Sequence, residues 1–187
     1  MLINFPEIVD NKKKLNGFTL PREVTKKMEG LIESSLNNDK EMAFNLCKNN
    51  NNELMDDTIR LGYQHEIKST RSCTKGKYVG QFHTHPPNGG GSSDLSFFDI
   101  ANIYNDGLGC IGGTLDGLIF CDIRKGEVDT KGKEKIVAEA NKFNRKILSD
   151  GTMKHLDKLE YDKSIKKLRG ELFNTFLIAE LYEEEYD

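Results

Sequence analysis

The sequence contains no tryptophan, only four prolines and no excess of basic residues. Its 27 lysines and arginines are outnumbered by 30 acidic residues, which gives a formal net charge of -3. A protein that neutralises nucleic-acid phosphates needs a surplus of positive charge on some face. This balance therefore argues against a general nucleic-acid binder and against binding to acidic membranes. We expect neither nucleic acid nor membrane among its partners.

Long apolar runs are also absent. No stretch approaches the roughly 20 apolar residues that a bilayer-spanning helix needs, and residues 1–14 lack the pattern of a signal peptide. The four cysteines contain no Cys-x-x-Cys pair, which argues against a cysteine-built zinc site. Cys47, Cys110 and Cys121 stand in apolar or glycine-rich surroundings, whereas Cys73 lies in a polar segment. We expect the first three to be buried core residues in a reducing cytoplasm.

The sequence does contain clear helical and strand-like periodicities. Apolar spacing predicts a helix over residues 20–36 and helices after residue 127, along stripes at 136–147 and 165–179. Apolar runs predict strands at 41–47, 58–67 and 77–85, a short helix at 96–105 and a hairpin over 108–123. We therefore predict an α/β (more loosely α+β) fold. Residues 1–127 would form the main domain, and residues 128–187 a helical extension packed on it.

The most informative segment begins with His83-Thr84-His85 on the predicted strand 77–85. Residues i and i+2 of a strand point to the same face, so the two imidazoles can bind one ion. Imidazole suits zinc, and a carboxylate as third ligand leaves the fourth tetrahedral position open for water. Such coordination is typical of a catalytic zinc site, whereas a structural site has four protein ligands.

Asp99, at the start of the following predicted helix, is the natural third ligand. Ser96 and Asp99 also have the form of a capping box, in which both side chains accept backbone N–H groups at the helix start. The two roles are compatible, because a first-turn carboxylate can also point toward a neighbouring strand end. Asp94 is the other acidic candidate, but no serine stands three residues before it.

The combination of H-x-H-P, a polar loop and S-x-x-D resembles the JAMM (MPN+) family of zinc metalloproteases, which remove ubiquitin or ubiquitin-like modifiers. The family pattern also includes a glutamate at the head of a strand after an N-terminal helix, where Glu41 stands. The glycine-rich run 108–113 resembles the family's next strand, so the resemblance covers roughly residues 18–125. Thirteen residues separate His85 from Asp99, more than the family usually has. We interpret this departure as an expansion of the glycine-rich loop.

The resemblance implies a curved, mixed sheet flanked by helices. It also implies zinc-dependent cleavage of a peptide or isopeptide bond after the C-terminal tail of a ubiquitin-like modifier. Glu41 would be the general base that activates the zinc-coordinated water. The Ser96 hydroxyl would donate a hydrogen bond to the tetrahedral oxyanion. Glu53 and Glu66 compete for the role of base, although each has a position typical of a solvated surface charge.

Other functions remain open. A related hydrolase could act on a sulfur-carrier protein or a cell-wall peptide. A non-catalytic binding module could use the same fold, but such modules generally lose the zinc ligands, whereas His83, His85 and an aspartate are present here. A zinc nucleobase deaminase would need H-x-E and P-C-x-x-C, and neither occurs. The expected partner is a ubiquitin-like or sulfur-carrier protein, and the oligomeric state is not predicted.

Overall fold

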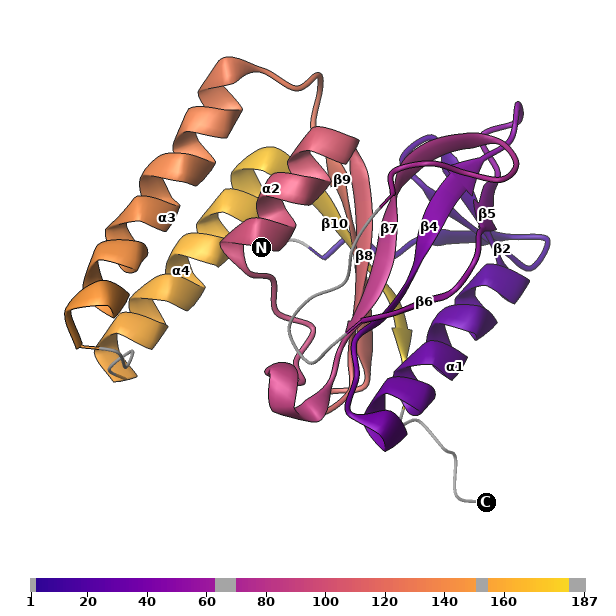
Figure 1. Ribbon diagram of the computed structural model, residues 1–187. Helices are drawn as coiled ribbons and strands as arrows, with labels where there is room; N and C mark the ends of the chain where they lie inside the picture. The colour runs from indigo at the N-terminus through magenta and orange to yellow at the C-terminus, as the bar shows by residue number, and fades with distance from the viewer. Residues whose placement is uncertain (1–2, 63–69, 151–154, 182–187) are drawn as a thin grey trace.

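The computed structural model describes residues 3–62, 70–150 and 155–181. Its main feature is a curled, mixed sheet of seven strands in the order β10-β9-β8-β7-β4-β5, with β6 paired to β4 (Figure 1). β7 and β8 run parallel, and the other neighbouring strands run antiparallel. The strands are β4 (Met42–Lys48), β5 (Leu54–Asp56), β6 (Arg60–Leu61), β7 (Lys77–His85), β8 (Leu108–Gly113), β9 (Leu118–Arg124) and β10 (Phe173–Glu180).

Helices cover both faces of this sheet (Figure 1). On one face, α1 (Arg22–Asn38) packs Met28 and Ile32 into the same apolar core as Phe44 and Phe82. On the other face lie α2 (Phe97–Asp106), α3 (Thr130–Asp150) and α4 (His155–Leu172). Their core includes the aromatic rings of Phe97, Phe143 and Tyr161, which pack against one another. The arrangement is the expected mixture of helices and strands around a curled sheet.

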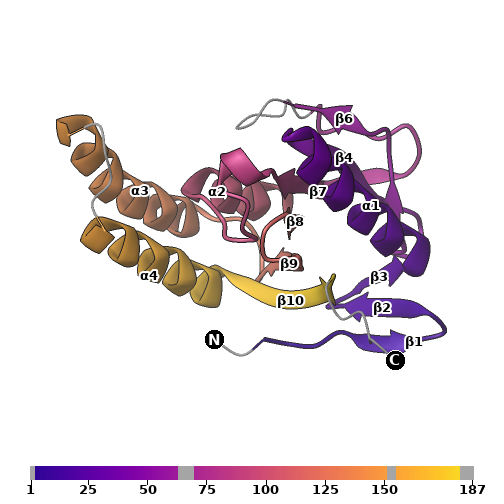
Figure 2. The same cartoon turned by 90° about the horizontal axis from the view of Figure 1, so that it is seen from below.

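A second, three-stranded sheet precedes α1 and has no counterpart in the predicted elements. It consists of β1 (Glu7–Val9), β2 (Lys12–Leu15) and β3 (Phe18–Pro21). Thr19 pairs with Glu53 beside β5, and Asn4 pairs with Phe176 of β10, so this segment links the two edges of the main sheet (Figure 2). Its strands are short and mostly exposed, and therefore carry little apolar periodicity.

Most of the predicted elements agree with the structure to within about two residues at their ends. These are α1, β4, β7, α2 and the β8–β9 hairpin. The first C-terminal helix, expected after residue 127 with an apolar stripe at 136–147, is α3. In the weak strand expected at 58–67, only β6 is a strand, and residues 63–69 lie outside the described residues.

The helix expected through residue 179 is wrong in its last part. α4 ends at Leu172, and the following residues form β10, which pairs with β9. The apolar residues from 165 to 179 match a helical period, but the long-range pairing with β9 overrides it from Phe173 onward. The C-terminal segment therefore contributes a strand to the main sheet as well as two helices. The domain boundary after residue 127 stays a prediction.

A buried ion pair fixes this C-terminal segment to the sheet. Arg169 of α4 donates to both carboxylate oxygens of Asp122 on β9, with N···O distances of 2.9 and 3.2 Å. The hydroxyl of Thr175 on β10 donates to the same carboxylate. Asp122 is 2% exposed and Arg169 is 8% exposed. A bidentate guanidinium–carboxylate pair of this kind fixes geometry as well as charge.

The structure joins all four cysteines in two disulfides, Cys47–Cys73 and Cys110–Cys121. The expected burial is confirmed for Cys47, Cys110 and Cys121, but the two disulfides were not predicted. Cys110 and Cys121 are direct partners in the β8–β9 register, a pairing that local composition cannot reveal. Because disulfides are typical of oxidising environments, they remove the basis on which we expected a cytoplasmic protein. The compartment stays a prediction.

Among the described residues, no helix combines the length and the apolar character that crossing a membrane requires.

Replacing Arg169 with alanine is expected to lower the free energy of unfolding by about 3–5 kcal/mol, because it leaves the Asp122 carboxylate buried without its cation. Chemical denaturation measures this loss. Lys166 lies on the same helix but is exposed, and Lys166→Ala should change stability by no more than about 0.5 kcal/mol. Equal losses in the two variants would contradict the role of the ion pair.

Candidate metal centre

The candidate site lies where the β7–α2–β8 unit turns from strand to helix. Parallel pairing of β7 with β8 requires a crossover, and α2 makes it on the face opposite α1. The C-terminal end of β7 carries His83 and His85, and the chain then returns at the N-terminus of α2, which carries Asp99. Crevices at the carboxyl ends of strands in open α/β sheets are common ligand sites.

The two histidines converge as their i, i+2 spacing predicts. Their Nε2 atoms lie 3.2 Å apart. Two ligands of a tetrahedral zinc ion, each about 2.0–2.1 Å from the metal, are separated by about 3.3 Å. The observed spacing therefore fits two imidazoles that share one ion.

Two carboxylates flank the imidazoles. Asp99 contacts both rings, with Oδ1 at 3.2 Å from His83 Nε2 and Oδ2 at 3.7 Å from His85 Nε2. Glu41 Oε1 lies 3.9 Å from His83 Nε2. Glu41, His83 and His85 each offer a ligand atom within 4.8 Å of the others, so this group could hold a metal ion. The structure thus brings together the three predicted ligands and the predicted base.

Asp99 forms the predicted capping box at the same time. Its Oδ2 accepts the Ser96 backbone N–H at 2.8 Å, while the Ser96 hydroxyl accepts the Asp99 backbone N–H at 3.1 Å. The Ser96 hydroxyl also donates to Asp99 Oδ2 at 2.6 Å. The capping hydrogen bonds therefore engage Oδ2 of Asp99, whereas Oδ1 is directed at His83. The cap orients the carboxylate toward the histidines.

Burial and mutual charge set the protonation of these groups. Burial by itself lowers the pKa of His83, but the hydrogen bond and charge of Asp99, with the charge of Glu41, raise it above 6.5 overall. Burial, followed by the charge of His83, lowers the pKa of His85. Burial also opposes ionisation of Asp99, yet the two imidazoles and Ser96 hold its pKa well below its usual range. Contacts with the two imidazoles and Ser96 therefore favour the ionised form of Asp99.

The backbone of the loop before α2 orients His85. The carbonyl of Ser92 lies 2.8 Å from His85 Nδ1, which assigns the ring proton to Nδ1 and leaves Nε2 as an acceptor or ligand. The close approach of the Ser92–Ser93 backbone to β8 needs glycine at position 113, the register partner of His85. A Cβ at position 113 would lie 2.4 Å from Ser93 N.

The same loop is also held by hydrogen bonds from Asn88 to Asp39 and from Ser93 N to Asp116.

Thr84, the residue between the two histidines, fixes the backbone next to Glu41. It points to the opposite face of β7, is fully buried, and its hydroxyl accepts the Met42 backbone N–H at 3.0 Å. The same hydroxyl donates to Ser35 at 2.8 Å, and Ser35 donates to the Lys40 carbonyl at 2.7 Å. In the sequence, the only sign of this structural role of Thr84 was its position between two histidines. That sign was too weak to predict the hydrogen bonds of its hydroxyl.

A pocket extends from His83 between α2 and the strands β7 and β8. The Nε2 atom of Gln81 is buried there and has no hydrogen-bond partner in the part of the chain that the structure describes. Asn102 and Asp106 of α2 add further polar atoms to the lining. None of these three residues was predicted from the sequence. The lining consists of Gln81, His83, Asp99, Asn102, Ile103, Asp106, Leu108, Gly109 and Ile111.

The rival acidic residues lie elsewhere or are not described. Asp94 is exposed and contacts Ser92 through its backbone N–H and its carboxylate. Glu53 pairs with Lys12 and Asn49 beside β5. Glu66 lies outside the described residues. Of the described candidates, Asp99 and Glu41 are therefore the carboxylates that reach the histidines.

Comparison of the sequence with models of known protein families gives no match, and comparison with curated proteins gives none either.

The purified protein is expected to bind about one zinc ion per chain at this site. Elemental analysis of the His83→Ala/His85→Ala double variant should show that this zinc is lost, because both imidazole ligands are removed. Asp94→Asn is the matched control and should keep the metal. Retention of this zinc by the double variant would refute the site.

Thr84→Val removes the buried hydroxyl but keeps the shape of the side chain. The Met42 N–H and the Ser35 hydroxyl each lose a partner, so the free energy of unfolding should fall by about 1–3 kcal/mol. Thr84→Ser retains the hydroxyl and should lose clearly less in the same denaturation experiment. A valine variant as stable as the serine variant would show that these hydrogen bonds contribute little.

Proposed function

We propose that the protein is a zinc-dependent peptidase of the JAMM type. It would cleave the peptide or isopeptide bond that follows the C-terminal tail of a ubiquitin-like modifier. The observation that carries this proposal is the convergence of His83, His85, Asp99 and Glu41 at one end of β7. The resemblance of the sequence pattern supplies the reaction class.

The two carboxylates of the site, those of Asp99 and Glu41, differ in their position relative to the histidines. Asp99 contacts both imidazoles, and its cap orients it, so His83, His85 and Asp99 would hold the zinc ion. Glu41 lies just before β4, and its carboxylate is farther from His83 Nε2 than that of Asp99, at 3.9 against 3.2 Å, so it would act beside the ion. Bound zinc would lower the pKa of a coordinated water and polarise the scissile carbonyl.

Glu41 would accept the proton of the attacking water and deliver it to the departing amine. The Ser96 hydroxyl donates to Asp99 in this structure. To serve the reaction it would turn that hydrogen toward the developing oxyanion. This assigns Ser96 a hydrogen-bonding role, and no nucleophilic one.

The pocket beside His83 would receive the acyl side of the scissile bond. Gln81 presents a buried amide donor there, next to His83 on the same face of β7. A buried donor without a partner is costly, and a carbonyl of an extended peptide would satisfy it. The pocket therefore favours a peptide tail as substrate. The same chemistry would serve a ubiquitin-like modifier or a sulfur-carrier protein.

The decisive experiment compares Asp99→Asn with Glu41→Gln. Loss of an anionic ligand should weaken zinc binding strongly in Asp99→Asn. Glu41→Gln should keep the zinc, while cleavage falls by about 10²–10⁴-fold, the usual range for a lost general base. Zinc content is measured by elemental analysis, and cleavage with a panel of linear fusions to ubiquitin-like and sulfur-carrier proteins.

Glu53→Gln is the matched control, because Glu53 pairs with Lys12 far from the histidines in the fold. It should keep both zinc and activity. If Glu41→Gln cleaves as fast as the unaltered protein, Glu41 is not the base. If the unaltered protein holds zinc but cleaves no fusion in the panel, the function is a binding one or has another substrate.

A further inference from the structure

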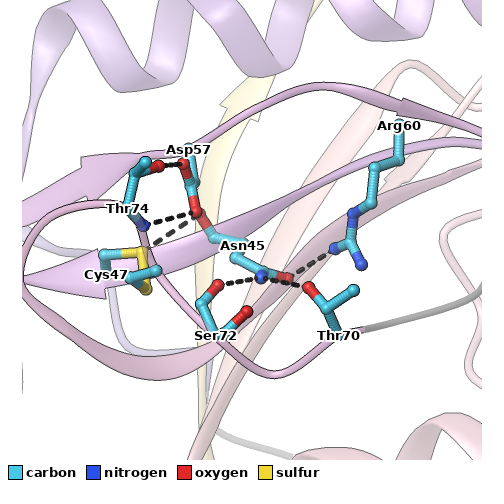
Figure 3. Close-up of a disulfide and its surroundings, with 8 residues drawn as sticks. Asn45, Cys47, Asp57, Arg60, Thr70, Ser72 and Thr74 are labelled. Carbon is cyan, nitrogen blue, oxygen red and sulfur yellow. Dashed lines mark hydrogen bonds between the residues drawn. A yellow bond between two sulfur atoms is a disulfide. The ribbon is translucent and has the colours of Figure 1, made fainter.

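A second group of potential metal ligands lies at the other end of β4. Cys47, Asp57 and Cys73 each offer a ligand atom within 4.8 Å of the others. Cys47 lies six residues along the chain from Glu41, which corresponds to about 20 Å of extended strand. The group is therefore distinct from the histidine site. In the structure, the two sulfurs form a disulfide (Figure 3).

Asp57 is held against the segment that carries Cys73. It follows β5, and its carboxylate accepts the backbone N–H of Thr74 at 3.2 Å as well as the Thr74 hydroxyl (Figure 3). These hydrogen bonds, with that of the Thr58 backbone, keep the pKa of Asp57 below 3.8. The carboxylate is thus ionised at neutral pH and lies beside the sulfurs.

The segment before β7 is also anchored independently of its disulfide. The side-chain amide of Asn45 on β4 donates to the Ser72 carbonyl at 2.5 Å, and Arg60 donates to the Asn45 carbonyl oxygen (Figure 3). On the other side, Arg71 pairs with Asp106 at 3.2 Å and donates to Asn102 at 3.1 Å. Breaking the sulfur–sulfur bond would therefore leave Cys73 close to Cys47.

The donor set suits zinc. Two thiolates and one carboxylate are ligands that zinc accepts in tetrahedral sites. Sulfurs that share one zinc ion at about 2.3 Å each lie about 3.8 Å apart, so reduction must let them separate by about 2 Å. Cys47 is fixed on β4, whereas Cys73 is only half-buried and lies outside the strands, between exposed neighbours. A small shift of Cys73 is enough to open the site.

We propose that Cys47, Cys73 and Asp57 form a second zinc site that exists only in the reduced protein. In the oxidised protein the two cysteines are a disulfide. In the reduced protein they bind one Zn²⁺ together with Asp57, and water takes the fourth position. The metal then replaces the disulfide as the link between β4 and the segment before β7.

A dithiol reductant transfers two electrons and two protons to the disulfide, which yields two thiols, and the reductant becomes a disulfide itself. Binding of Zn²⁺ then displaces one proton from each thiol. Zinc binding at this site should release protons, whereas the disulfide form should bind no zinc here.

The test uses the His83→Ala/His85→Ala variant, so that zinc at the histidine site does not contribute. The protein is either oxidised or reduced with a phosphine, which does not itself supply thiol ligands. It is then loaded with zinc chloride and separated from free metal. Elemental analysis should find about one zinc per chain after reduction and none after oxidation. Loading with Co²⁺ should give a near-ultraviolet thiolate-to-metal absorption band only in the reduced protein.

Three further variants assign the ligands. Cys73→Ser should abolish both the zinc and the cobalt band, although Cys110 and Cys121 remain as buried thiols. Asp57→Asn keeps both cysteines and should weaken zinc binding by more than about 10-fold, the lower end of the loss seen even for residues that only support a ligand. Asp56→Asn is the matched control and should bind like the parent, because the Asp56 carboxylate pairs with Lys27.

Equal zinc in the oxidised and reduced proteins would overturn the proposal, and so would a cobalt band that survives Cys73→Ser. Unchanged affinity in Asp57→Asn would remove Asp57 from the site. None of these results depends on the protein having peptidase activity, so they are separate from the test of the proposed function.

Discussion

The parallel pairing of β7 with β8 is the constraint on which the candidate metal centre depends. Parallel neighbours cannot be joined by a tight turn, so the chain must leave the end of β7 and return across one face of the sheet. The helix that makes this return starts beside the strand end that carries the two histidines. Asp99 is therefore near His83 because of topology, and the capping box then fixes the direction of its carboxylate.

Electrostatics explains why this arrangement suits a cation. The side chains of Glu41, His83, His85 and Asp99 are each only 10–13% exposed. Burying two carboxylates is unfavourable unless positive charge faces them. Protonation of His83 would supply one such charge, and a divalent cation held by both imidazoles would supply more. Both would face the Asp99 carboxylate, so they would compete.

The sequence was informative wherever a feature is local. The i, i+2 histidines on β7, the S-x-x-D cap and the helical stripe of α1 each depend on neighbours within a few residues, and the structure contains all three. Features set by distant partners were missed. β10 is a strand because it pairs with β9, and Cys110 meets Cys121 because of sheet register.

The tight turns of the N-terminal strands did carry a local sequence signal. Asp10, Asn11, Asn16 and Gly17 all have positive φ, a conformation that these residue types tolerate.

The bridge between Asn4 and Phe176 has a consequence for the order of events during synthesis on the ribosome. Helix α1 and the strands from β4 to β9 can form as they emerge, but the outer neighbour of β9 is made only near the end of the described chain. Until α4 emerges, the Asp122 carboxylate lacks the guanidinium that neutralises it, and the N-terminal strands lack one of the two sheet edges that they link. A nascent chain that stops before Arg169 therefore has an incomplete sheet. Its exposed strand edge could pair with the wrong strand or be bound by a chaperone. Completion of the sheet therefore waits until β10 has been synthesised, and it joins the N-terminal segment to β10.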